Sequence, residues 1–131
     1  MQRHSISGWR IHMDNGRRYM DTARRGLARP EVFTNDLILQ LAAMAMESLL
    51  VSVWQYYGYL PYDHTLSGLV EGLADFCPLS EAFVNCAKQV EGFDDICTLL
   101  PGFRRSPSDA DIAGILNCGE QLVQFVHSRL N

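Results

Sequence analysis

The chain has 131 residues, of which 47% are hydrophobic and 20% are charged, and its net charge is −4. This length is usual for one domain, and this composition supports a hydrophobic core without disulfide bonds or a structural metal. These values exclude a chain too short or too polar to fold alone, so we predict a single domain over residues 1–131.

The first predicted helix spans residues 11–28 and is amphipathic. One face carries apolar and aromatic side chains, namely Met13, Tyr19, Met20, Ala23 and Leu27. The opposite face carries arginines, namely Arg17, Arg18, Arg24, Arg25 and Arg29. We expect only the apolar face to be buried, and Pro30 ends the helix.

This basic element differs in charge from the rest of the chain. Residues 1–30 contain seven arginines and two aspartates, whereas residues 31–131 contain four basic and thirteen acidic residues. A basic element on an acidic body can attract phosphate, but it can also dock on the acidic remainder, and we favour docking. We also favour a solvated arginine face over nucleic-acid binding, because no aromatic residues interleave with the arginines.

The second predicted helix spans residues 35–57 and is apolar on nearly every side. Thr34 or Asn35 is its expected N-cap, and Gly58 and Pro61 end it. Such a helix lies at the centre of a bundle or is shared with a dimer interface, and we predict a homodimer through it. The surrounding run, residues 37–60, is no membrane span, because it is interrupted by Gln40, Glu47, Ser48, Ser52 and Gln55.

Three further helices complete the prediction. The third spans residues 65–76, where Gly68 and Gly72 share one face and indicate close approach of a neighbouring helix. The fourth spans residues 80–99, and the fifth spans residues 107–130 behind a strong N-terminal signature, Ser108 to Asp111. Five helices with short connections predict an all-α, up-and-down bundle of four or five helices.

Other features of the chain indicate a cytoplasmic protein without metal or cofactor. The N-terminus has no apolar stretch behind it, so we predict no signal peptide. The four cysteines contain no C-x-x-C pair, and we interpret them as buried thiols rather than a metal site or disulfides: Cys77, Cys86, Cys97 and Cys118. No phosphate-binding loop, paired-carboxylate metal site or Ser-His-Asp pattern is present, so nothing indicates an independent enzyme.

The stretch from residue 42 to residue 73 resembles HEPN domains. These domains have a helix of small residues leading to a glutamate, then a glycine turn and a proline, then a His-x-Leu-x-x-Leu segment. The matching positions are Ala45, Glu47, Leu50, Gly58, Pro61, His64, Leu66 and Leu69. Phe103 to Pro107, before a Ser/Asp-capped last helix, also fits many members.

The resemblance has two departures. Many members carry lysines just after the glutamate, where this chain has Ser48, Val51 and Ser52. The ribonuclease branch carries R-x(4–6)-H, and none of the four histidines here has an arginine five to seven residues before it. That motif joins a cation to a titratable imidazole near a phosphodiester, so we do not predict RNA cleavage.

The resemblance implies a binding module rather than an enzyme. Such a module would bind a nucleotide or pair with a separate nucleotidyltransferase chain. The alternatives are a divergent HEPN ribonuclease that uses His64 with Arg104 or Arg105, and a purely structural interaction domain.

Five residues are the candidate ligand-binding positions: Glu47, Tyr62, His64, Arg104 and Arg105. The two arginines precede the last helix, whose N-terminus favours phosphate, although its first-turn aspartates can take them as partners. For Glu47 we favour a structural ion pair, with an arginine of the first helix or of the Arg104–Arg105 turn. The alternative is a polar group in a ligand cleft. His64 can cap a turn, which we favour, or line a cleft with Tyr59 and Tyr62.

Overall fold

The computed structural model describes residues 4–93 and 106–130. Within these ranges the chain forms five α-helices, one short 3-10 helix and no strand, which confirms the all-α class. The α-helices are α1 (Trp9–Gly26), α2 (Asn35–Tyr56), α3 (Leu66–Gly72), α4 (Glu81–Gly92) and α5 (Asp109–Arg129). The 3-10 helix η1 (Leu73–Asp75) directly follows α3.

Side-chain caps determine where α2 and α5 begin. Thr34 Oγ1 accepts the Leu37 N–H at 3.2 Å. At α5, the Asp111 N–H donates to Ser108 Oγ at 3.1 Å, and the Ser108 N–H donates to Asp111 Oδ2 at 2.9 Å. This reciprocal pair is a capping box, which satisfies donors that a helix start otherwise leaves without partners.

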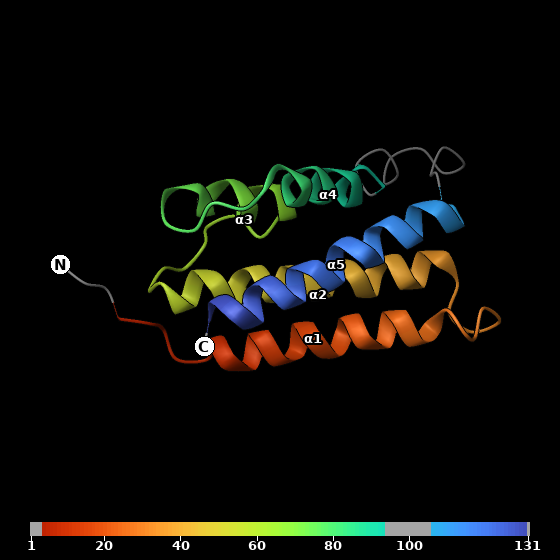
Figure 1. Cartoon of the computed structure of the whole chain (residues 1–131), viewed down its shortest axis with the longest axis horizontal. Helices are drawn as coiled ribbons and strands as arrows, with labels where there is room; N and C mark the ends of the chain where they lie inside the picture. The colour runs from red at the N-terminus through yellow and green to blue at the C-terminus, as the bar shows by residue number, and fades with distance from the viewer. Residues whose placement is uncertain (1–3, 94–105, 131) are drawn as a thin grey trace.

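The four longer helices alternate in direction, as an up-and-down bundle requires (Figure 1). α1 packs antiparallel against α2 in the most extensive of the helix interfaces. α5 runs parallel to α2, because Asn35 at the start of α2 bonds to Asp109 and Tyr57 just past its end bonds to Arg129. α3 and α4 form a second layer over α2, on the side away from α1.

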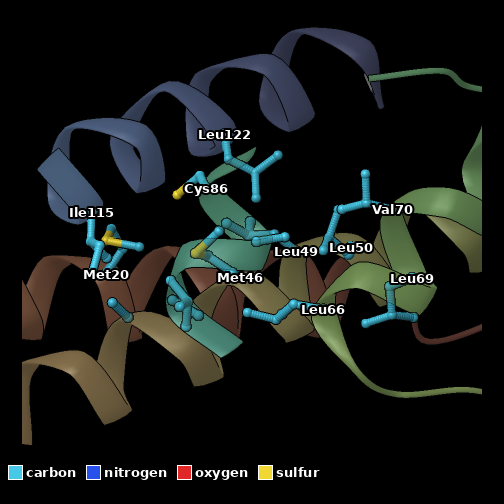
Figure 2. Packing of buried hydrophobic residues seen from close by; sticks show 14 of the residues in the cluster. Met20, Met46, Leu49, Leu50, Leu66, Leu69, Val70, Cys86, Ile115 and Leu122 are labelled. Carbon is cyan, nitrogen blue, oxygen red and sulfur yellow. The ribbon is translucent and has the colours of Figure 1, made fainter. Parts of the chain in front are cut away.

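The hydrophobic core is built around α2, of whose 22 residues eleven are buried. Its buried leucines and Met46 meet side chains from the other helices (Figure 2). By length and hydropathy alone α2 could cross a membrane, a test that the core helix of a soluble protein also passes. Here it lies at the centre of the bundle, where each fully buried leucine contributes roughly 1.5–3 kcal/mol.

Close approach of α3 to α2 occurs at one of its two glycines. A Cβ on Gly72 would clash with the Trp54 ring of α2, which confirms the expected contact between helices. The expectation is wrong for Gly68, whose nearest neighbours are Asp63 and Thr65. The reason is local: these two side chains fold over the start of α3 and take the space beside Gly68.

Candidate functional site

Glu47 and His64, two of the predicted site residues, contact each other on the surface. His64 Nδ1 lies 3.3 Å from Glu47 Oε1, although 17 positions separate them in the sequence. The side chains are 46% and 57% exposed, respectively, so both remain accessible to a ligand. Solvent screens this pair, which therefore adds little to stability.

The positions of both residues follow from local structure. Glu47 lies on a stripe of α2, with Gln40 and Met44, that faces away from the core. His64 lies in the turn before α3, between Asp63, whose Oδ1 accepts the Thr65 N–H at 2.8 Å, and the N-cap Thr65 itself. That hydrogen bond holds the pKa of the Asp63 carboxyl below its usual value.

Two adjoining grooves share this pair of residues. The first, of about 330 Å³, lies between α2, α3 and α4 and is lined by Ala43, Met44, Glu47, His64, Thr65, Leu66, Val90 and Glu91. The second, of about 220 Å³, lies between α1 and α2 and is lined by His12, Tyr19, Met44, Glu47, Ser48, Val51 and His64. We call the border between them, formed by Met44, Glu47 and His64, the Glu47–His64 site.

The first groove combines apolar surface with hydrogen-bond acceptors. Glu91 is already oriented, because it accepts the Ser67 N–H at 2.8 Å and the Ser67 hydroxyl at 2.7 Å. Glu47 retains free lone pairs, and His64 can donate or accept according to its protonation. The two carboxylates favour a partner with N–H or O–H groups and disfavour a phosphate at this position.

The second groove contains a histidine that sequence reasoning did not select. His12 Nδ1 lies 2.9 Å from Gln55 Oε1 and 3.2 Å from the Gly8 carbonyl oxygen, so this nitrogen carries the proton. Because Gln55 is 43 positions away in the sequence, no local pattern around His12 indicated the contact.

The remaining predicted residues are placed as follows. The ion pair of Glu47 with an arginine is not found in the described part of the chain, where the partner of Glu47 is His64 in the turn before α3. Tyr62 is fully exposed and lines neither groove. Tyr59 stacks on Phe76 with ring centroids 4.7 Å apart and lines neither groove, so the alternative of a cleft shared by His64, Tyr59 and Tyr62 is not found. Arg104 and Arg105 lie outside the described residues.

Among residues 4–93 and 106–130, no three His, Cys, Asp or Glu side chains form a metal-binding group. No family model matches this sequence, and no curated protein or solved structure is significantly similar to it. The site is therefore interpreted from its own chemistry.

Proposed function

We propose that this chain is a HEPN-like helical module that binds a nucleotide at the Glu47–His64 site and has no catalytic activity of its own. One observation carries the proposal. Glu47 and His64, which match positions of the HEPN pattern on separate elements, meet at the border of two grooves. The five-helix bundle around them supports it.

The first groove suits the base and sugar of a nucleotide better than its phosphates. Met44, Leu66 and Val90 provide apolar surface for a flat ring. Glu47 can accept hydrogen bonds from an exocyclic amine or a ribose hydroxyl. The phosphates would then point away from these carboxylates.

The same resemblance suggests a protein partner. A HEPN-like module without catalytic residues would act with a separate nucleotidyltransferase chain, to which it presents a bound nucleotide. Under this proposal the catalytic machinery lies entirely in the partner. The module contributes the binding site and, as a homodimer, two copies of it.

The test is a melting-temperature measurement with each common nucleoside triphosphate. A nucleotide at about 100 times its dissociation constant adds roughly 2.7 kcal/mol of stability. For a chain of this length that corresponds to a shift of about 10 °C. We expect one base to give a larger shift than the others, and the Glu47→Gln variant to lose that preference while its fold is kept.

Tyr62→Ala is the matched control, because Tyr62 is exposed and lines neither groove. It should keep the full shift. If no nucleotide changes the melting temperature, or if Tyr62→Ala loses as much as Glu47→Gln, the proposal is wrong. A purely structural interaction domain would then be the better interpretation.

A divergent ribonuclease is the second candidate function. The contact of His64 with Glu47 favours it, because a carboxylate that orients an imidazole is a common arrangement for proton transfer. Arg104 or Arg105 would supply the cation. Cleavage of a labelled single-stranded RNA that disappears in His64→Ala would establish this function and replace the first proposal.

A further inference from the structure

The two carboxylates of the first groove differ in what they can still accept. Both oxygens of Glu91 are occupied, Oε1 by the Ser67 N–H at 2.8 Å and Oε2 by the Ser67 hydroxyl at 2.7 Å. Among the described residues, the hydrogen-bond partner of Glu47 is His64, whose Nδ1 lies 3.3 Å from Oε1. A carboxylate has about four lone-pair sites, so Glu47 keeps an acceptor on each of its oxygens. Glu47 is therefore the group in this groove that can accept two hydrogen bonds from one ligand.

The apolar side chains of the groove can hold a flat ring but cannot identify it. Met44, which is 45% exposed, lies one turn before Glu47 on α2, and Leu66 of α3 and Val90 of α4 line the same groove. Apolar contacts favour any aromatic ring over water and have no directional preference among the bases. Discrimination between bases must therefore come from Glu47.

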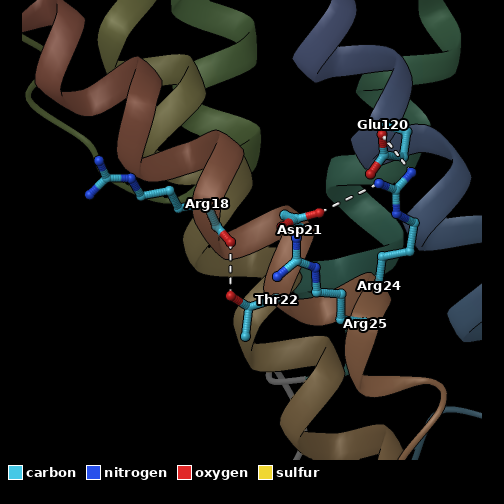
Figure 3. A network of polar contacts seen from close by, with 6 residues as sticks. All are labelled: Arg18, Asp21, Thr22, Arg24, Arg25 and Glu120. Atoms are coloured by element: carbon cyan, nitrogen blue, oxygen red, sulfur yellow. Dashed lines mark hydrogen bonds and ion pairs between the residues drawn. The ribbon is translucent and has the colours of Figure 1, made fainter.

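The arginines of α1 take no part in this groove. Arg24 is engaged on another face of α1, where its guanidinium nitrogens lie 3.5 Å from Asp21 Oδ1 and 3.5 Å from Glu120 Oε2 (Figure 3). The contact with Glu120 docks α1 on α5, as the acidic body of the chain led us to expect. No arginine or lysine is among the described residues that line the first groove. Selectivity in this part of the chain therefore concerns the base rather than the phosphates.

We propose that the first groove selects guanine, whose N1–H and N2–H groups donate to the two oxygens of Glu47. This inference rests on the proposed function and names the base. Guanine is the one common base that presents two adjacent N–H donors on its Watson–Crick edge, and their spacing matches a carboxylate. Adenine and cytosine present an amino group beside a ring-nitrogen lone pair, and uracil presents one N–H between two carbonyl oxygens. Each of these edges turns a lone pair toward the carboxylate, which repels it.

The size of the preference follows from this pair of hydrogen bonds. The side chain of Glu47 is 46% exposed, so water competes for both bonds and the selectivity is at the low end for a bidentate contact. We expect GMP to bind about tenfold more tightly than AMP. IMP keeps the N1–H but lacks the N2 amino group, so its affinity should lie between the two.

Calorimetric titration of the whole chain with GMP, IMP and AMP, near neutral pH, tests the inference. The Glu47→Gln variant should prefer AMP to GMP, because an amide presents an acceptor beside a donor, the pattern that matches adenine. A reversal of preference requires a folded site, so it cannot result from loss of the fold. Glu71→Gln is the matched control: it removes one carboxylate from the exposed surface of α3, outside both grooves, and should keep the preference for GMP.

The outcomes separate this inference from the proposed function. Equal affinity for GMP and AMP, or a preference for GMP that survives in Glu47→Gln, would overturn the selection of guanine and leave nucleotide binding in place. Loss of the preference in Glu71→Gln to the same extent as in Glu47→Gln would also overturn it. Absence of binding by all three nucleotides would overturn both.

Discussion

Two cysteine thiols, Cys86 of α4 and Cys118 of α5, form a hydrogen bond across the bundle. The bond to Cys118, together with burial, raises the pKa of Cys86. The same bond lowers the pKa of the half-buried Cys118. Cys118 is therefore the more acidic thiol of the pair, and we expect it to be the more reactive of the two.

We expect iodoacetamide to label Cys118 before Cys86, at a rate that rises as pH approaches its lowered pKa. Mass spectrometry of the digested protein would follow each site. Cys86→Ala removes the hydrogen-bond partner and should raise the pKa of Cys118, whereas Cys86→Ser keeps a hydroxyl and should change it less. Equal labelling of both thiols would contradict this assignment.

At the scale of residues, the sequence indicated candidates but not their contacts. Glu47 and His64 stood out because both match the HEPN pattern, and Glu47 also because a glutamate lies inside an apolar helix. Their pairing depends on how the chain turns between α2 and α3, which no local pattern encodes. The outward position of Glu47 was equally hidden, because its neighbour Met44 is apolar yet 45% exposed.

Glycines distinguish the helix surfaces that touch from those that face solvent. Gly72 of α3 lies against the Trp54 ring, whereas a Cβ on Gly114 of α5 would meet nothing within 4 Å. Both positions have a helical backbone, Gly72 as the last residue of α3 and Gly114 inside α5, so alanine suits the backbone at each. The surroundings should therefore decide whether alanine raises or lowers the free energy of unfolding.

We expect Gly72→Ala to lower the free energy of unfolding by about 1–3 kcal/mol, because α3 must move away from Trp54. The matched Gly114→Ala should raise it by up to about 1 kcal/mol, because alanine favours the helix and nothing is displaced. Urea unfolding of both variants provides the measurement. If both variants changed the free energy of unfolding in the same direction, the α2–α3 contact would be looser than described.

At the scale of elements, caps and breakers predicted the boundaries well. The bounds expected for the first, second and fifth helices lie within two residues of those observed, because Thr34, Ser108 and Pro30 act locally. The third prediction was too long. The helix ends at Gly72 and continues only as the 3-10 turn η1, in which the Phe76 N–H bonds back to the Leu73 carbonyl oxygen three residues earlier. The fourth prediction, residues 80–99, was also too long, since α4 ends at Gly92 with Phe93 as its C-cap; residues 94–99 lie outside the described chain.

The arrangement of helices was only partly predictable. Amphipathicity identified the buried face of α1, where Met20 and Ala23 lie in the core. It did not identify the neighbours of α2, because a helix that is apolar on every side has no preferred direction of packing. Helix order and short turns suggested antiparallel neighbours, but the parallel contact of α2 with α5 required the structure.

The homodimer through α2 stays a prediction at the scale of the whole molecule. Met44 is the large apolar side chain that α2 leaves exposed, and it lies beside Glu47 on the outward stripe. We expect light scattering to give twice the chain mass of 14.8 kDa, and Met44→Glu to shift the protein toward the monomer. A monomeric mass for the unchanged protein at high concentration would contradict a dimer.

Both ends of the described chain are attached to the same end of α2. The Ile6 N–H donates to the Gln55 carbonyl oxygen at 2.7 Å, and Arg129 Nε donates to the Tyr57 hydroxyl at 3.0 Å. A short peptide linker between the ends would leave every helix contact in place, so the bundle is suited to circular permutation. A domain fused to either end of the described chain would be attached at the same end of the bundle.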